Sequence, residues 1–212
     1  MKKILFVIDK IELKYFEFNR LVTNFWIIKE FLERKNQVYI TTIPNLSLKG
    51  DIAYTKCFET FLNNDNIFYK DVKIERRIDD FDLVMFRPDP PVDIDYINAT
   101  YVFDFVKRAQ VINSPKAIRD FNEKLHSVYF KDLMSPNIVT ASLKDIEDFL
   151  AIHKEIVIKP LNRCFGSGVM YLYEGDPNTR TIINTMTNNE TTLVMVQEFI
   201  PLVKKGDKRV LT

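Results

Sequence analysis

Glycine is scarce in this chain of 212 residues, which holds 5 glycines against 9 prolines and 17 phenylalanines. Average usage of about 7% would give roughly fifteen. The shortage excludes collagen-like repeats and flexible Gly/Ser designs. It also excludes two glycine-dependent nucleotide motifs, because neither G-x-G-x-x-G nor G-x-x-x-x-G-K-[ST] occurs. All glycines except Gly50 lie after residue 165, so we expect any glycine-dependent chemistry near the end of the sequence.

Cysteine and long apolar runs are also sparse. Cys57 and Cys164 form no C-x-x-C motif, and we expect two reduced thiols. The apolar run at residues 4–8 is shorter than the ~7–15 residues of a signal-peptide core, and no run approaches the ~18 residues of a membrane span. A net charge of +1 requires neither nucleic acid nor an anionic membrane as partner. We therefore expect a cytoplasmic protein.

The N-terminal part of the chain predicts a parallel sheet. Residues 3–8 form a continuous apolar run, which is typical of a strand buried on both faces. Residues 20–34 have helical spacing, and residues 38–42 form a second apolar run. A strand, a helix and a strand in this order favour a parallel pair. The apolar stripe of the expected helix comprises Leu21, Phe25, Ile28 and Leu32.

Weaker extended segments follow. Residues 52–62 and 67–74 show partial alternation on either side of an Asn/Asp cluster, so we expect a hairpin appended to the sheet. The remaining elements expected here are a strand at 81–86, a helix capped by Asp93 or Asp95 that ends near residue 107, and a strand at 109–112.

A change of pattern near residues 113–121 predicts a domain boundary. We expect an N-terminal parallel-sheet domain over residues 1–118 and an α+β domain over residues 119–212. The elements expected in the second domain are helices at 120–132, 143–153 and 178–188, and strands at 156–159, 169–173, 193–199 and from 206 onward. Asp120 is expected at the start of the first helix, and Ser142 is expected to cap the second.

A lysine and a glycine-containing loop predict an anion site in the second domain. Lys159 ends an apolar strand, and Gly166-Ser167-Gly168 precedes the next strand. Backbone N–H groups of such a loop can cradle phosphate oxygens, while lysine supplies a point charge. A surface lysine beside an ordinary hairpin turn is the alternative. Lys124, taken alone, is typical of a solvated helix lysine.

Two later segments carry polar groups that suit a nucleotide. The strand before Pro201 ends in Gln197, Glu198, Phe199 and Ile200. Backbone groups at such a strand end can meet an adenine edge, and a carboxylate can meet a ribose; a plain edge strand is the alternative. The charge cluster at residues 206–209 is typical of a solvent-facing strand start, but its Arg209 could also face a transferring phosphate.

A proline-rich segment at residues 87–91 follows an expected buried strand. Open α/β sheets bind ligands at the carboxyl ends of their parallel strands, and Arg87 could hold a carboxylate bidentately. A rigid loop with a structural pair of Arg87 and Asp89 is the alternative. His126 and His153 are isolated in the sequence, so we assign no metal ligand.

The order of these motifs is more specific than any one of them. The most particular segments are 119–125, which reads R-D-F-N-E-K-L, and 174–177, which reads E-G-D-P. The other segments of the pattern are 87–91, 99–101, 113–115, 158–160 and 206–211. Together, they resemble bacterial glutathione synthetases, members of the ATP-grasp superfamily, from one end of the chain to the other.

The resemblance implies an N-terminal pre-ATP-grasp domain, the first part of an ATP-grasp domain, and a ligase activity. ATP would phosphorylate the terminal carboxylate of γ-glutamylcysteine, and the amine of glycine would attack the acyl phosphate. Glutathione, ADP and phosphate would result. The implied partners are these two small molecules, the implied cofactors are ATP with Mg²⁺ or Mn²⁺, and a homo-oligomer is compatible with the family.

The resemblance also implies roles for individual positions. Lys124 and Lys159 resemble the two lysines that bind the nucleotide phosphates. The loop over those phosphates corresponds to Gly166, Ser167 and Gly168. The hinge that contacts adenine corresponds to Gln197, Glu198, Phe199 and Ile200, and a further nucleotide contact to Asp207. Substrate contacts correspond to Arg87 and Asp89, and a catalytic contact to the acyl phosphate corresponds to Arg209.

Two departures from the family pattern leave other hypotheses open. Arg163 and Phe165 stand where the family's loop has glycines, so either the loop closes differently or Arg163 supplies charge instead. The family's metal ligands are expected beyond Thr212, so we expect an incomplete sequence whose 212 residues alone lack ligase turnover. The alternatives are a related ATP-grasp ligase with another acceptor, and a non-catalytic binding module.

Overall fold

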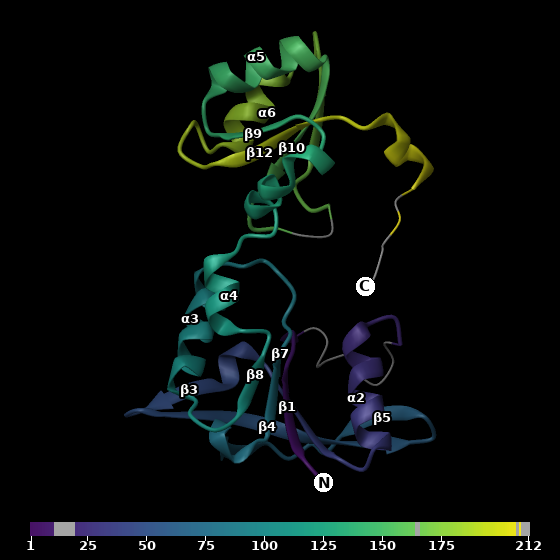
Figure 1. Cartoon of the computed structure of the whole chain (residues 1–212), viewed down its shortest axis with the longest axis vertical. Coiled ribbons are helices and arrows are strands. Elements are labelled where there is room, and N and C mark those ends of the chain that lie inside the picture. The colour runs from purple at the N-terminus through teal and green to yellow at the C-terminus, as the bar shows by residue number, and fades with distance from the viewer. Residues whose placement is uncertain (11–19, 164–165, 207, 209–212) are drawn as a thin grey trace. The chain divides into compact units, whose positions relative to one another are not determined.

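The chain forms two compact α/β units, each built on its own sheet (Figure 1). The structure is a computed structural model that describes residues 1–10, 20–163, 166–206 and 208. The first unit is Met1–Asp120 and the second is Phe121–Thr212. The mixed α/β class predicted from the sequence is confirmed.

The first unit is built on an 8-stranded sheet with a parallel centre. Strands β2, β1, β7 and β8 are parallel and adjacent in that order, and the long strand β4 pairs with β2 in the antiparallel sense. Strands β3, β5 and β6 all pair with β4. The bounds are β1 Lys3–Val7, β2 Gln37–Thr41, β3 Leu46–Lys49, β4 Ile52–Asn63, β5 Asn66–Tyr69, β6 Ile74–Arg77, β7 Leu83–Phe86 and β8 Gln110–Ile112.

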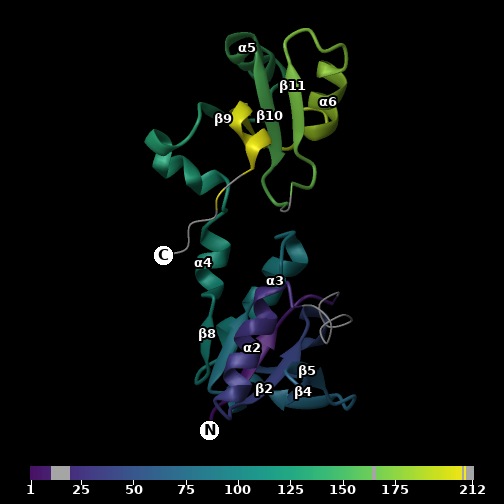
Figure 2. The same ribbon diagram turned by 90° about the vertical axis from the view of Figure 1, so that its right-hand side faces the viewer.

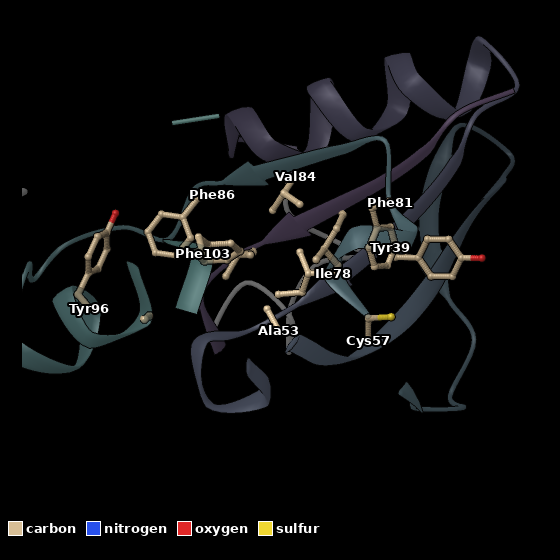
Figure 3. Close-up of a cluster of buried hydrophobic side chains, with 12 residues drawn as sticks. Tyr39, Ala53, Cys57, Ile78, Phe81, Val84, Phe86, Tyr96 and Phe103 are labelled. Atoms are coloured by element: carbon tan, nitrogen blue, oxygen red, sulfur yellow. The ribbon is translucent and has the colours of Figure 1, made fainter. Parts of the chain in front are cut away.

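Apolar clusters cover both faces of this sheet, which explains the continuous apolar run of β1. Helix α2 (Thr23–Glu33) places Phe25 and Ile28 against one face, in a cluster with Phe6. Helix α3 (Ile94–Val102) belongs to the opposite cluster, where the Phe86 ring lies between those of Tyr96 and Phe103 at 5.3 and 5.2 Å (Figure 3). A strand buried on both faces needs apolar residues at every position rather than at alternate ones.

Three details of the first unit differ from the sequence-based expectations. Leu21 precedes α2 and is 98% exposed, so it is not part of the apolar stripe. The segment expected to extend over 67–74 divides into β5 and β6, with the charged residues Lys70 and Asp71 between them. Asp93 is the N-cap of α3 and accepts a hydrogen bond from the Tyr96 N–H, but that helix ends at Val102.

The second unit is built on a 4-stranded antiparallel sheet in the order β11-β10-β12-β9. Its bounds are β9 Asn137–Thr140, β10 Glu155–Pro160, β11 Met170–Tyr173 and β12 Val194–Glu198, with helices α5 Leu143–His153 and α6 Thr179–Met186. Both helices share one core with this sheet, and α6 contacts β11 (Figure 2). Ile156 and Ile158 of β10 belong to that core. The intervening Val157 and Lys159 therefore project from the other face.

The prediction of a helix over 120–132 is wrong. Asp120 instead ends a short helix, α4 (Pro115–Asp120), and a 3₁₀ segment, η5, covers Leu125–Leu133. The Asn122 side chain explains why η5 starts separately from α4. Its Oδ1 accepts hydrogen bonds from the N–H groups of Lys124 and Leu125 at 3.0 and 2.9 Å. Strand β9 was not predicted, whereas α5 begins after Ser142, as expected.

Among the described residues, no helix is both long enough and apolar enough to cross a membrane.

Truncating Ile28 should destabilise the first unit. Ile28 is fully buried, so Ile28→Ala is expected to lower the free energy of unfolding by about 2–5 kcal/mol. Urea titration followed by the fluorescence of Trp26, the single tryptophan and a neighbour on α2, measures this directly. Val72→Ala is the control, since Val72 is 62% exposed and the loss should stay within about 0.5 kcal/mol. Equal losses in the two variants would contradict the assignment of Ile28 to the core.

Candidate functional site

A cavity of about 570 Å³ opens on the face of the second unit's sheet that α5 and α6 do not cover. Its walls are mostly apolar. The lining residues are Ser135, Val157, Lys159, Val169, Tyr171, Gln197, Glu198, Phe199, Ile200, Leu202, Val203 and Gly206. An apolar slot with a few convergent polar groups is the usual form of a small-molecule site.

Lys159 and Gln197 meet in this cavity. The Lys159 ammonium donates a hydrogen bond to the Gln197 Oε1 at 2.5 Å. Burial lowers the pKa of Lys159 from its usual value, and the positive charge of Lys124 lowers it further. Two ammonium groups near each other in a partly desolvated place repel, and a bound anion would relieve that repulsion.

Lys124 lies at the N-cap of η5 rather than inside an α-helix. Its ammonium pairs with the Glu123 carboxylate at 2.7 Å and also donates a hydrogen bond to the backbone carbonyl of Arg163. Arg163 belongs to the connection between β10 and β11. Lys124 therefore contacts the loop that the sequence singles out for phosphate binding.

The Gly166-Ser167-Gly168 segment forms a turn before β11, and among the described residues none of the three lines the cavity. Both glycines have positive φ, +70° at Gly166 and +75° at Gly168. A Cβ at Gly168 would lie 3.0 Å from the Pro160 Cγ, whereas one at Gly166 would meet nothing within 4 Å. Space as well as backbone conformation therefore favours glycine at 168.

The expected hinge residues do line the cavity, and the sheet holds their backbone. The Glu198 N–H donates to the Pro136 carbonyl at 2.9 Å, and the Phe199 N–H donates to the Glu155 carbonyl at 3.0 Å. The Phe199 ring lies edge-on to Tyr171 with centroids 4.8 Å apart. These contacts give the cavity a rigid aromatic corner.

Arg87 and Asp89 lie in the first unit, after β7. The Arg87 Nε donates a hydrogen bond to the Oδ1 of buried Asn24 at 2.5 Å. Arg87 and Asp89, both among the described residues, form no ion pair with each other. The Asp89 side chain is exposed, and its backbone N–H donates to the Asp9 carboxylate at 2.7 Å. Burial raises the pKa of Asp9, and the charge of Asp89 raises it further.

Asp9 and Asp89 line a second cavity, of about 550 Å³, together with Asp93, Asp95 and Tyr96. Burial and the charges of Asp9 and Asp89 raise the pKa of Tyr96 to about 12. Among the described residues, Arg87 is not part of this lining. The described lining holds these four carboxylates against the one ammonium group of Lys10, so it is acidic and suits a cationic group better than a carboxylate.

Two family models together match almost the whole chain. The model described as prokaryotic glutathione synthetase, N-terminal domain, matches residues 2–119, and the model described as prokaryotic glutathione synthetase, ATP-grasp domain, matches residues 123–212. The chain belongs to the prokaryotic glutathione synthetase family.

Curated relatives agree with this family assignment. The glutathione synthetase of Neisseria meningitidis serogroup B is 34% identical over 221 residues, which cover 100% of this chain and 68% of the relative. Those of Buchnera aphidicola subsp. Schizaphis graminum and Nitrosomonas europaea are 34% and 35% identical, covering 89% of this chain and 60% and 61% of the relatives. The chain thus spans about two thirds or less of the length of these glutathione synthetases.

Solved structures show the same fold at low identity. D-alanyl-alanine synthetase A from Vibrio cholerae matches with a TM-score of 0.59 at 11% identity, over 94% of this chain and 60% of that one. D-cycloserine synthetase matches with a TM-score of 0.57 at 15% identity, with the same coverage. At these identities, the likeness concerns the fold alone.

Two positions that the resemblance assigns to the site, Asp207 and Arg209, lie outside the described residues. So do Cys164, expected as a reduced thiol, and Phe165, which stands where the family's loop has a glycine. In the part of the chain that the structure describes, no group of three or more His, Cys, Asp or Glu side chains is placed to hold a metal ion.

Removing Lys124 should raise the pKa of Lys159, because the positive charge of Lys124 disfavours the ammonium form of Lys159. We expect Lys124→Met to move the pH midpoint of Lys159 acylation upward, as measured by peptide mass spectrometry. Lys144→Met is the control, because Lys144 is exposed on α5 and pairs with Asp148. An unchanged midpoint in Lys124→Met would show that the two ammonium groups do not interact.

Alanine should be tolerated less well at Gly168 than at Gly166. Both positions have positive φ, so each substitution is expected to cost about 1 kcal/mol of backbone strain. Gly168→Ala adds the contact with the Pro160 ring and should lower the thermal midpoint further than Gly166→Ala. Equal midpoints in the two variants would contradict the close approach of Gly168 to Pro160.

Proposed function

We propose that this protein is a glutathione synthetase that joins γ-glutamylcysteine to glycine with ATP. The observation that carries the proposal is the pair of ammonium groups beside an apolar cavity, in a chain of this family. The cavity suits an adenosine group, and the two lysines suit the phosphates that follow it. Lysine binds phosphate as a point charge, and a partly desolvated pair strengthens that attraction.

In this proposal, the parts of ATP correspond to separate groups of residues. The adenine ring lies against Val157, Tyr171 and Phe199, with the hinge residues Glu198 and Ile200 along its edge. The ammonium groups of Lys124 and Lys159 bind the phosphates. Gly166, Ser167 and Gly168 belong to the loop over the phosphates, and Asp207 to a further polar contact.

The chemistry needs positive charge and exclusion of water at the transferred phosphoryl group. A carboxylate oxygen of γ-glutamylcysteine attacks the γ-phosphorus of ATP, and ADP leaves. The glycine amine then attacks the acyl carbon, loses a proton, and expels phosphate. Lys159 stabilises the charge of the phosphoryl group during the first step. Arg209 is proposed to contact the acyl phosphate during the second.

We also propose substrate contacts in the first unit. Asp89 lines an acidic cavity, which suits the α-ammonium group of a γ-glutamyl substrate. Arg87 is assigned to a substrate carboxylate, with Asn24 holding its guanidinium in place. The same proposal includes Mg²⁺ or Mn²⁺ as the metal that accompanies ATP. It also includes a cytoplasmic location and a homo-oligomer.

Turnover should require Lys159. In the full-length protein, ADP release is expected to depend on both γ-glutamylcysteine and glycine, and Lys159→Met should lower kcat/KM by roughly 10²–10³-fold, as for other lost transition-state donors. Lys144→Met is the matched control and should retain activity, because its ammonium pairs with Asp148 on the exposed side of α5.

A panel of acid and amine substrates decides the specificity. The proposal fails if γ-glutamylcysteine does not support ADP release while another acid does. That outcome would favour a related carboxylate–amine ligase. Tight binding of ATP and γ-glutamylcysteine without any ADP release by the full-length protein would favour a binding module.

A further inference from the structure

Gln197 was expected in the hinge that contacts adenine, but its side chain is engaged elsewhere. We propose that Gln197 is a positioning residue that holds the Lys159 ammonium toward the phosphates of ATP and makes no contact with adenine through its side chain. This inference rests on the proposed ATP-binding function and assigns one residue of that site a different task.

The strand register places the two side chains side by side. Gln197 pairs with Val157 across β10 and β12, and Lys159 pairs with Met195. Lys159 and Gln197 are therefore diagonal neighbours on one face of an antiparallel pair, within reach of long side chains. The bond of 2.5 Å between the Lys159 Nζ and the Gln197 Oε1 follows from that placement.

The chemistry of the amide suits this task. Lys159 is half-buried and near the charge of Lys124, so both its surroundings and its neighbour disfavour the ammonium form. A hydrogen bond from the ammonium to an amide oxygen favours the charged form. Because the amide is neutral, it leaves the full positive charge available for a phosphate, whereas a carboxylate at the same place would cancel it.

The burial of Gln197 argues against an adenine contact by its side chain. Gln197 is 9% exposed, whereas Ile200 farther along the hinge is 53% exposed. Its carbonyl oxygen already accepts the bond from Lys159. A contact with adenine through that oxygen would have to share it with the ammonium group, which weakens the hold on Lys159.

Measurements of nucleotide affinity distinguish a Gln197 that positions Lys159 from a Gln197 that contacts adenine. In Gln197→Met of the full-length protein, we expect ATP affinity to fall about tenfold, the size typical of one lost hydrogen bond to a charged group, with adenosine affinity nearly unchanged. Calorimetric titration measures both. Tyr171→Ala is the control for the adenine subsite and should weaken ATP and adenosine by the same factor, because Tyr171 lines the apolar wall.

A double-mutant cycle tests whether Gln197 acts through Lys159. If it does, adding Gln197→Met to Lys159→Met should cause no further loss of ATP affinity. Independent contacts would instead give losses that add. Circular dichroism and thermal unfolding verify that each variant is folded; methionine keeps the length of the glutamine side chain.

The reactivity of Lys159 gives a readout that needs no nucleotide. At fixed pH, Gln197→Met should increase acylation of the Lys159 amine, because more of it is neutral, and Gln197→Glu should decrease it. Three outcomes would overturn the inference while leaving the proposed function intact. They are additive losses of ATP affinity in the double mutant, equal losses of ATP and adenosine affinity in Gln197→Met, and unchanged acylation of Lys159. Absence of ATP binding by the unaltered protein would overturn both.

Discussion

The second unit depends on the alternation of side chains along β10 and β12. Ile156 and Ile158 of β10 and Val194 and Val196 of β12 enter the core that α5 and α6 share with the sheet. Val157, Lys159 and Gln197 alternate with them and line the cavity. The same register that buries Ile156 and Ile158 thus presents Val157 and Lys159 to the cavity. A shift by one residue would exchange the two sets, because the side-chain period of a strand is two.

In the first unit, the parallel strands bring polar residues together at one edge of the sheet. Strands β1 and β7 are adjacent and parallel, so Asp9 and Arg87 follow them at the same edge of the sheet. The polar groups there are held by backbone and amide contacts, as between Arg87 and Asn24. The acidic cavity that results is consistent with binding outside the carboxyl ends of parallel strands.

Much of the fold could be predicted because it follows from local patterns. Continuous apolar runs identified β1 and β7, and a serine before an apolar period identified the start of α5. The failure at 120–132 has a specific cause: the Asn122 side chain takes backbone N–H groups that a continuing helix would use. The prediction that Leu21 belongs to the apolar stripe of the helix also failed, because Leu21 precedes α2 and cannot share its buried face.

The candidate site was predictable in part for the same reason. The period of two along β10 places Val157 on the face of Lys159, a signal present in the sequence. The bond between Lys159 and Gln197 depends on which strands pair and in which register, and these are properties of the whole sheet. The pairing of Arg87 with Asn24 likewise joins residues 63 positions apart. Patterns of neighbouring residues in a single sequence do not predict hydrogen-bond partners that lie this far apart.

The close approach of Gly168 to Pro160 has an evolutionary consequence. The two residues stand at opposite ends of the connection between β10 and β11, and the proline ring occupies the space that a side chain at 168 would need. Their histories should therefore be linked: a side chain is gained at 168 more easily where the ring at 160 has been lost. The contact itself places no such restriction on Gly166, where the positive φ alone favours glycine.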